Sequence, residues 1–209
     1  MHELSRKLES DIYIPTPKGL DYFPFQKAGI EYCVKNPNHN TLIGDEPGLG
    51  KTIQFIGFCN YVGAINIVII CPASLVLNWA REIQKWHVGN PTIEVIYSGK
   101  QKLNPSIDVH IASYSMIINK DVHAFLQRKN PDAMAIDEVH YLKNPEAKRT
   151  KAAYIDAGNL VDRASNVIAL SGTPIINRPK EIYETTIKLC PKALNGMNYE
   201  TFPSHDPRS

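Results

Sequence analysis

Residues 44–52 read GDEPGLGKT and contain most of the phosphate-binding loop pattern G-x-x-x-x-G-K-[ST]. The closing G-K-T is in place, but the first glycine of the pattern should fall at position 45, which is occupied by Asp45. Gly48 and Gly50 let the main chain curl so that its N–H groups face phosphate oxygens. Because a helical pattern begins at Lys51, the positive end of a helix dipole would add to that site. Taken alone, the stretch is either a nucleotide site or a glycine-rich turn before a helix.

Outward from this loop, six short apolar runs rich in Ile and Val predict buried strands. They cover residues 41–44, 66–71, 92–97, 107–112, 133–137 and 166–171. Helical patterns lie between several of these runs, at residues 51–62, 74–86, 144–158 and 178–190. Strands that alternate with helices predict an α/β fold with a mainly parallel central sheet and helices on both faces. If the glycine loop is a nucleotide site, this fold is that of a P-loop NTPase.

The helical segment 74–86 has a clear amphipathic pattern. Leu75, Trp79 and Trp86 share one face, so core packing is the expected role of both tryptophans. Ser74 is the predicted N-cap, because its hydroxyl oxygen can accept a bond from an N–H group of the first turn.

Composition narrows the classes of function. The 209 residues are 43% hydrophobic and 21% charged, and the formal net charge of +2 is too small to predict nucleic-acid binding by itself. The four cysteines are scattered without a C-x-x-C pair, which argues against a zinc site and a disulfide framework. The apolar runs are too short for a membrane span and the N-terminus shows no export signal. We therefore expect a cytoplasmic setting, or a nuclear one in a eukaryote, or the host cytoplasm for a viral protein.

Polar residues gather where five of the predicted strands end. The first strand runs into the glycine loop, the second into CPAS, the fourth into ASYS, the fifth into DEVH and the sixth into SGTP. In open α/β sheets, ligands bind beyond the carboxyl ends of the strands. This agreement of position is stronger support for a binding site than any single motif.

Asp137 and Glu138 follow the fifth apolar run and complete a nucleotide-hydrolase pattern with the loop. Lys51 is expected to reach the β- and γ-phosphates, and the Thr52 hydroxyl is expected to bind Mg²⁺. Asp137 is the second expected Mg²⁺ ligand, and Glu138 is expected to polarise the attacking water. The predicted catalytic residues are therefore Lys51, Asp137 and Glu138. Without the loop, two solvated acids in a turn would be the simpler interpretation.

Three stretches carry a family resemblance. GDEPGLGKT, DEVH at residues 137–140 and SGTPIINRPKEIY at residues 171–183 together resemble the superfamily-two helicase-like ATPases of the Swi/Snf type, over roughly residues 20–200. In that family the loop reads D-E-x-G-x-G-K-T, so Asp45 is the expected residue. YFPFQKAGIEY and CPASLVLNWAREIQKW look most like the annealing-helicase branch.

The resemblance implies a RecA-like lobe that uses ATP and Mg²⁺ and acts on duplex or forked DNA. The implied nucleotide contacts are Gln26 at the adenine edge and the loop residues Asp45, Glu46, Gly48, Leu49, Gly50, Lys51 and Thr52. The implied coupling residues are His140, Ser171, Gly172 and Thr173. The implied DNA contacts are Pro72, Ser74, Asn78, Ser113 and Tyr114. Simpler alternatives are a helix-surface glutamine at position 26 and a plain strand end at positions 113 and 114.

The same resemblance sets the expected domain organisation. Residues 1–20 are a predicted lead-in, residues 21–202 a predicted ATP-binding domain and residues 203–209 a predicted disordered tail. Nothing after Tyr183 resembles the motifs of a second lobe, so we expect the first lobe of a two-lobe motor, weakly active or inactive without its partner lobe in cis or trans.

Two other classes of function stay open. One is a non-catalytic module that binds nucleotide or DNA and docks on a partner motor, and the other is a small P-loop kinase. The basic run AKRTK at residues 147–151 is more typical of a solvated helix face than of a DNA contact.

Overall fold

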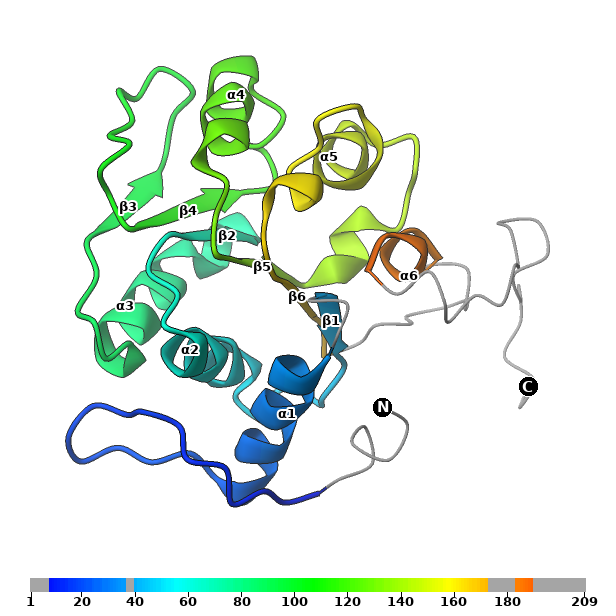
Figure 1. Ribbon diagram of the computed structural model, residues 1–209. Helices are drawn as coiled ribbons and strands as arrows, with labels where there is room; N and C mark the ends of the chain where they lie inside the picture. The colour runs from blue at the N-terminus through cyan, green and yellow to red at the C-terminus, as the bar shows by residue number, and fades with distance from the viewer. Residues whose placement is uncertain (1–7, 37–39, 173–182, 190–209) are drawn as a thin grey trace.

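The computed structural model describes residues 8–36, 40–172 and 183–189. A six-stranded sheet with the order β1-β6-β5-β2-β4-β3 lies at its centre (Figure 1), and every strand pair is parallel. The strands are β1 (Asn40–Ile43), β2 (Ile67–Cys71), β3 (Ile93–Ile96), β4 (Val109–Ser113), β5 (Ala133–Asp137) and β6 (Val167–Leu170). All six predicted strands are present with small shifts of their ends, and the predicted parallel α/β fold is confirmed.

Helices cover both faces of the sheet. One layer consists of α1 (Pro24–Lys35), α2 (Lys51–Val62) and α3 (Val76–Trp86), which lie below the sheet in Figure 1. The other layer contains α4 (Lys120–Lys129), α5 (Lys148–Thr150), the π-helical turn η4 (Lys151–Ile155) and α6 (Tyr183–Leu189). Three short 3₁₀ turns complete the described elements: η2 (Ala73–Leu75), η3 (Val139–Leu142) and η5 (Val161–Arg163).

The central strand β2 shows why the apolar runs form a buried sheet. All of its residues are buried, and they alternate between two hydrophobic cores. Ile67 and Ile69 pack into the core beneath α1–α3, whereas Val68 and Ile70 pack into the core beneath α4 and η4. Successive strand residues point to opposite faces, so a strand covered on both sides needs a continuous apolar run.

Helix α3 carries the amphipathic pattern that the sequence predicts. Trp79 and Ile83 are fully buried and Trp86 is nearly so, which confirms a place in the core for both tryptophans. The predicted N-cap at Ser74 is wrong, because Ser74 lies within η2 and α3 begins at Val76 without a side-chain cap. The cause is a tight 3₁₀ turn in which the Leu75 N–H donates to Pro72 O at 2.9 Å and delays the α-helix.

The predicted helix at 144–158 is shorter and less regular than expected. Only α5 is α-helical, and the chain then widens into η4, where the Asp156 N–H donates to Lys151 O at 2.9 Å. Of the predicted helix 178–190, the part 183–189 is helical and the remainder lies outside the described residues. Helix α4 has no counterpart among the predicted helices, although Asn119 caps it by accepting bonds from two backbone N–H groups.

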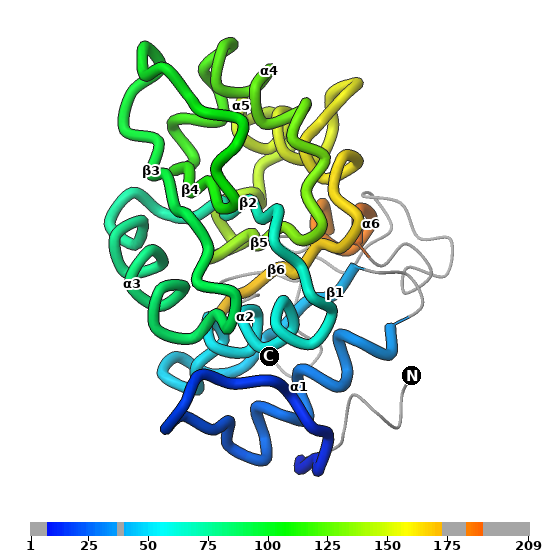
Figure 2. Tube along the Cα trace, turned by 60° about the vertical axis from the view of Figure 1, so that its left-hand side comes forward, coloured from blue at the N-terminus to red at the C-terminus, as the bar shows by residue number. Residues whose placement is uncertain are grey.

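The segment before α1 packs against the lobe (Figure 2). Ile14 and Tyr22 are buried in the core beneath α1 and α2, and the Asn60 side chain donates to Pro15 O at 3.2 Å. The Ser10 hydroxyl donates to the buried Glu31 carboxylate at 2.6 Å. Within the described ranges, none of the helices is long and apolar enough to cross a membrane.

Candidate functional site

The parallel sheet brings the polar segments of the sequence to one edge. Because every pairing is parallel, the carboxyl ends of the strands face the same way. The segments that leave these ends are residues 44–50 after β1, 72–75 after β2, 114–115 after β4, 138–140 after β5 and 171–172 after β6. They form two neighbouring depressions, a nucleotide cavity and a polar pocket, both defined below.

The glycine loop has the backbone that a phosphate cradle requires. Gly48 and Gly50 have φ angles of +88° and +75°, in the left-handed region that favours glycine. A Cβ atom at position 50 would lie 2.5 Å from Gln26 Nε2, so a side chain there would also collide with α1. Helix α2 begins at Lys51 without a side-chain cap, which leaves its first N–H groups for an anion.

Asp45 explains why the loop lacks its first glycine. Its carboxylate accepts a hydrogen bond from Gln54 Nε2 at 2.7 Å, which ties the start of the loop to α2. Asp45 is not among the residues with positive φ, so its backbone does not need glycine. The loop is a variant of the phosphate-binding pattern held by a side chain.

Lys51 folds back on the loop. Its ammonium group donates to the main-chain oxygens of Asp45 at 2.7 Å and Glu46 at 3.0 Å. These bonds close the curl of the loop, and they place the cation at the centre of the cradle. For the predicted contact with terminal phosphates, Lys51 would have to exchange these two carbonyl acceptors for charged oxygens, which bind an ammonium group more strongly.

Gln26 lies buried against the loop. Its Nε2 donates to Leu49 O at 3.2 Å, and its Oε1 accepts from the Phe23 N–H at 3.1 Å. Only 4% of the residue is exposed, so the alternative of a helix-surface glutamine is wrong. Recognition of adenine by Gln26 stays a prediction.

Asp137 ends β5 and is 8% exposed. One carboxylate oxygen accepts from Trp79 Nε1 at 2.8 Å, and the other accepts from the Glu138 N–H at 2.9 Å. Burial raises the pKa of the carboxyl group above its ordinary value of 3.8, while the hydrogen bond from Trp79 acts in the opposite direction. The bond from Trp79 is a contact within the candidate site that the sequence pattern missed, since the pattern indicated only core packing.

Glu138 has an unusual backbone. Its φ and ψ angles of 51° and 55° lie in the left-handed region, where it begins the turn η3. Its carboxylate lies 3.2 Å from His140 Nδ1, so the predicted catalytic and coupling residues are in contact. The turn directs both residues away from the buried strand.

These residues line a cavity of about 460 Å³, here called the nucleotide cavity. It is lined by Pro47, Gly48, Gly50, Lys51, Thr52, Ile53, Leu75, Asn78, Glu82, Asp137 and Glu138. The three predicted catalytic residues and both predicted Mg²⁺ ligands are therefore brought together. Asn78, a predicted DNA contact, lies in this cavity and not in the neighbouring pocket.

The donor set of the nucleotide cavity suits Mg²⁺. Thr52 offers a hydroxyl oxygen, and each Asp137 oxygen keeps a lone-pair site beyond the bond it already accepts. Mg²⁺ prefers such oxygens and usually binds to one or two carboxylates together with substrate phosphates. In the part of the chain that is described, no group of three or more His, Cys, Asp or Glu side chains could hold a metal on its own.

The segment after β6 passes close to the glycine loop. The Ser171 N–H donates to Ile43 O at 3.1 Å, and Ser171 is fully buried. A Cβ atom on Gly172 would lie 2.8 Å from Pro47 Cγ, so glycine is what permits the close approach. Of the predicted coupling residues, Gly172 thus lies against the phosphate loop and Ser171 is bonded to the end of β1 just before it, while Thr173 lies outside the described residues.

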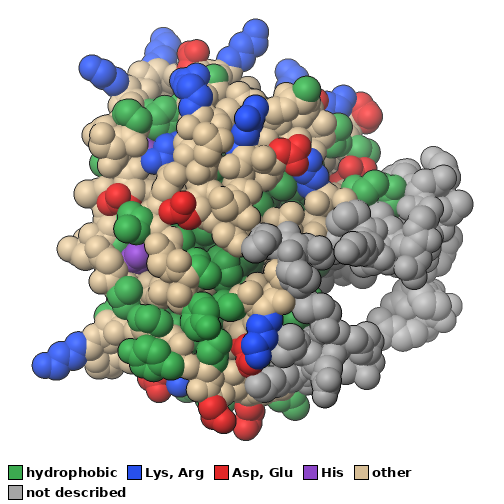
Figure 3. Space-filling model, viewed as in Figure 1, with side chains coloured by type: hydrophobic (Ala, Val, Ile, Leu, Met, Phe, Trp, Pro, Cys, Tyr) green, Lys and Arg blue, Asp and Glu red, His purple; other side chains and the backbone are tan. Residues whose placement is uncertain are grey.

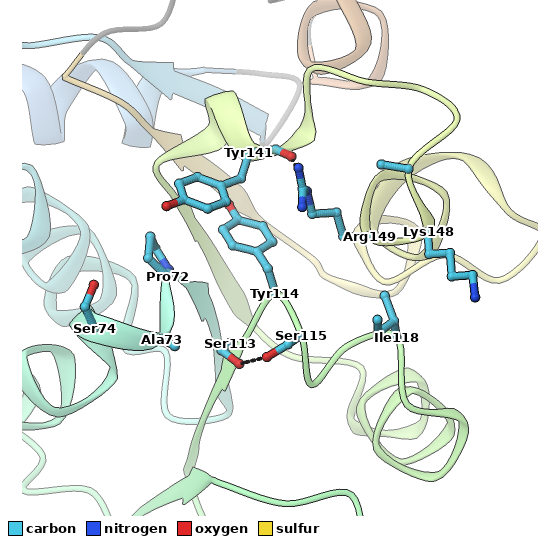
Figure 4. A pocket seen from close by; sticks show the side chains of 11 residues that line it. Pro72, Ala73, Ser74, Ser113, Tyr114, Ser115, Ile118, Tyr141, Lys148 and Arg149 are labelled. Carbon is cyan, nitrogen blue, oxygen red and sulfur yellow. Dashed lines mark hydrogen bonds between the residues drawn. The ribbon is translucent and has the colours of Figure 1, made fainter.

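A second depression of about 510 Å³, here called the polar pocket, lies at the same edge (Figure 4). Four of the predicted DNA contacts line it: Pro72, Ser74, Ser113 and Tyr114. The structure adds Ser115, Tyr141, Lys148 and Arg149 among others. Hydroxyl groups and cations of this kind are typical contacts of a nucleic-acid backbone.

An aromatic stack forms one wall of the polar pocket. Tyr114 and Tyr141 stack with ring centroids 5.2 Å apart and planes 1° from parallel, and the Arg149 guanidinium lies 5.8 Å from the centre of the Tyr141 ring. Arg149 Nε also donates to Tyr141 O at 2.6 Å. The Tyr114 hydroxyl donates to the main-chain oxygen of Asp137 at 2.6 Å, so this wall touches the nucleotide cavity.

Lys148 and Arg149 show where the sequence interpretation was incomplete. Both are exposed, as expected for a solvated face, yet both line the polar pocket. Lysine and arginine side chains surround α4 and α5 on the face shown in Figure 3. Tyr141 gave no signal in the sequence, because its place depends on the turn that follows Glu138.

The sheet, the glycine loop and the acidic pair define a RecA-like P-loop lobe. Residues 25–204 match the model of the SNF2-related domain, and the chain belongs to this family. Two solved structures share the fold: the Sulfolobus solfataricus SWI2/SNF2 ATPase core in complex with dsDNA, with a TM-score of 0.70, and the same core domain alone, with 0.72. Both structures are 25% identical to the chain in sequence. The matches include 94% and 95% of this chain, respectively, but only 40% of each solved core.

Relatives in sequence include proteins of the annealing-helicase branch. The chain is 32% identical over 170 residues to the SWI/SNF-related matrix-associated actin-dependent regulator of chromatin subfamily A-like protein 1 of Xenopus tropicalis, with 79% of the chain and 17% of the relative covered. It is 31% identical over 186 residues to the human DNA annealing helicase and endonuclease ZRANB3, with 86% and 17% covered. The chain thus spans about a sixth of the length of these relatives. Membership of this family sets the kinase alternative aside.

Proposed function

We propose that this chain is the ATP- and Mg²⁺-binding lobe of an SNF2-type ATPase that moves along or remodels duplex DNA. The observation that supports this most strongly is the nucleotide cavity, where Lys51 and Thr52 of the loop meet Asp137 and Glu138 of β5. The family is one of helicase-like ATPases. Action on duplex DNA is a property that we carry over from the solved core described in complex with dsDNA, and forked DNA is an alternative that rests on the family resemblance of the sequence.

In this proposal, different residues of the chain bind the phosphates, hold Mg²⁺ and orient the attacking water. The loop N–H groups and Lys51 bind the phosphates, while the Thr52 hydroxyl and the Asp137 carboxylate hold Mg²⁺. The bound ion supplies charge neutralisation at the phosphoryl oxygens. Glu138 orients the attacking water and accepts its proton, and His140 lies against the Glu138 carboxylate, with its Nδ1 at 3.2 Å.

Calorimetric titration with ATP tests the nucleotide site. With Mg²⁺, Lys51→Ala is expected to weaken binding by roughly 100-fold, the upper end of the range for a hydrogen bond to a charged group. Lys100→Ala removes an exposed lysine outside the nucleotide cavity and serves as the matched control. Equal affinity of the wild type and Lys51→Ala would refute the assignment of the phosphate site.

Hydrolysis by the chain alone is expected to be very slow. The chain covers 40% of the solved SWI2/SNF2 cores, and in related hydrolases a cation brought from outside the loop raises the rate by roughly 10³- to 10⁵-fold. We expect a gain of that order when a separately expressed second lobe and duplex DNA are added. Fast DNA-stimulated turnover by the chain alone would contradict this expectation. If the chain binds nucleotide but shows no turnover, either alone or with the second lobe and duplex DNA, the non-catalytic docking module is favoured.

The polar pocket is the proposed contact for the DNA backbone. It joins hydroxyl groups from the segments after β2 and β4 to the cations of α5. Backbone contacts of this kind position a protein on DNA without reading its sequence. One of the solved cores is described in complex with dsDNA, which agrees with duplex as the partner.

A further inference from the structure

Asp137 accepts hydrogen bonds from side chains of two of the three segments that line the polar pocket. Trp79 follows Ser74 by five positions along the η2–α3 segment, and Tyr114 directly follows Ser113 at the end of β4. Trp79 bonds to the Asp137 carboxylate, and Tyr114 bonds to the Asp137 main-chain oxygen. The proposed Mg²⁺ ligand is therefore hydrogen-bonded to two of the segments that line the proposed DNA contact.

Trp79 is positioned to hold the Asp137 carboxylate in one orientation. Its side chain is fully buried, and its ring meets Phe55 of α2 edge-on with centroids 5.7 Å apart. Because the indole nitrogen only donates, the bond to Asp137 Oδ2 has one possible polarity. The carboxylate oxygen keeps its second lone-pair site, so the same bond orients Asp137 without blocking a metal ion.

Tyr114 connects the surface of the polar pocket to the strand end. Its ring stacks on Tyr141, which is 38% exposed, while its hydroxyl reaches Asp137 O. Burial holds the pKa of the Tyr114 hydroxyl well above its ordinary value, so the group remains a donor. A contact that moves the Tyr141 ring therefore acts on the peptide unit between Asp137 and Glu138.

We propose that Trp79 and Tyr114 are positioning residues for Asp137, through which contact of a DNA backbone with the polar pocket tightens the binding of nucleotide-associated Mg²⁺. This inference rests on the proposed function of both depressions. A phosphate bound between the serine hydroxyls and Arg149 would restrain the two segments that hold Asp137. By thermodynamic reciprocity, Mg²⁺ and nucleotide would then tighten DNA binding by the same factor.

The test uses two variants of the full chain that each remove one donor and keep an aromatic side chain. Trp79→Phe removes the indole N–H, and Tyr114→Phe removes the hydroxyl. Trp86→Phe is the matched control on the same helix, because the buried Trp86 Nε1 has no hydrogen-bond partner among the described residues. Tyr22→Phe is the second control, since its buried hydroxyl bonds to Asn60 away from the metal ligands.

The main readout is the Mg²⁺ concentration that gives half-maximal binding of a fluorescent ATP analogue. Loss of a partner that orients a metal ligand typically costs 10- to 100-fold in metal affinity, so we expect about a tenfold rise for Trp79→Phe. For Tyr114→Phe, which acts through a neutral main-chain bond, we expect roughly a threefold rise. Affinity for the analogue in EDTA should stay at the wild-type value in both variants, and the controls should match the wild type throughout.

A second readout measures the coupling to DNA. Saturating short duplex should lower the Mg²⁺ requirement of the wild type by about fivefold, within the usual range for coupled sites. Trp79→Phe and Tyr114→Phe should reduce this factor toward one. A factor of one in the wild type would overturn the coupling.

The failures of the two proposals can be told apart. If the wild type binds no nucleotide, the proposed function fails, and this inference fails with it. If the wild type binds normally and both variants keep its Mg²⁺ requirement, the positioning role alone is overturned. If a variant loses as much affinity for the ATP analogue in EDTA as it loses in Mg²⁺, the substitution has caused a general packing defect. This result would also overturn the positioning role. Because Tyr114→Phe removes a single oxygen atom, the test stands even if Trp79→Phe does not fold.

Discussion

The nucleotide cavity and the polar pocket lie at the same sheet edge and both contain hydroxyl groups and cations, but they are built differently. In the nucleotide cavity the main chain dominates: Gly48 and Gly50 adopt positive φ, and Lys51 is bonded to loop carbonyls. In the polar pocket the groups are side chains from three separate segments, and the cations Lys148 and Arg149 are exposed.

This difference predicts different responses to substitution. A preorganised cradle places each group in a single position, so losing one group should remove most of its chemistry. Exposed cations act through screened charge, so substituting each one should cause a small loss of DNA affinity. These losses should be additive and should depend on the salt concentration. The predictions below test this contrast from the largest expected effect to the smallest.

Glu138→Gln should give the largest effect. The amide cannot accept a proton from the attacking water, and general-base catalysis contributes roughly 10²- to 10⁴-fold. We expect hydrolysis to fall by about 10³-fold when the chain is complemented with a second lobe and duplex. ATP and duplex affinities should stay unchanged, as measured by calorimetry and fluorescence anisotropy.

Asp137→Asn is the matched variant, because it should raise the Mg²⁺ requirement for ATP binding whereas Glu138→Gln should not. If the two variants behave alike in binding and turnover, the separate roles of the acidic pair are wrong.

The double variant Lys148→Gln, Arg149→Gln should weaken duplex binding by a smaller amount. Each lost phosphate contact should reduce the slope of log affinity against log salt by about 0.9. The loss should therefore be severalfold at low salt and shrink as salt rises, while ATP affinity stays unchanged. Arg81→Gln, an exposed arginine outside the polar pocket, is the control. A loss that does not depend on salt would contradict a backbone contact.

The smallest effect concerns stability and pH. Burial raises the pKa of Asp137 above 3.8 in the folded chain, so its contribution to stability is present at low pH and is lost as pH rises through the raised value. Asp137→Asn removes this titration, but its single carbonyl oxygen can satisfy only one of the two N–H groups that the carboxylate accepts from, which adds a cost that does not depend on pH. In EDTA, the melting temperature of the variant should therefore rise relative to that of the wild type as the pH increases from about 4 to about 7. A difference that is constant over this range would show that the titration of Asp137 plays no part.

The sequence predicted the sheet and the nucleotide cavity well for a physical reason. A strand buried on both faces needs a continuous apolar run, and a phosphate cradle needs glycine at fixed spacing, so both leave contiguous patterns. Helix α2 accordingly has the predicted bounds, residues 51–62. Each pattern can be recognised within one short segment, although the sheet and the cavity themselves join segments that are far apart in the sequence.

The sequence predicted less where distant residues meet. The bond between Trp79 and Asp137 joins residues 58 positions apart, and an apolar helix face gives no sign of it. Arg149 looked like part of a solvated face, because its contact with Tyr141 depends on how the chain turns after Glu138. Ser74 failed as an N-cap because the 3₁₀ turn at Pro72 competes with the start of α3.

The left-handed backbone of Glu138 has a consequence for attempts to engineer heat resistance. In the described part of the chain, the non-glycine residues with positive φ are Asn90, Asn130 and Glu138. Asparagine tolerates this conformation, whereas for most residues it costs about 1–2 kcal/mol. Glycine at position 138 would release that strain and would also remove the carboxylate that we propose orients the attacking water. A screen that rewards only a high melting temperature would therefore favour inactive molecules at this position, so any such library should keep residue 138 fixed.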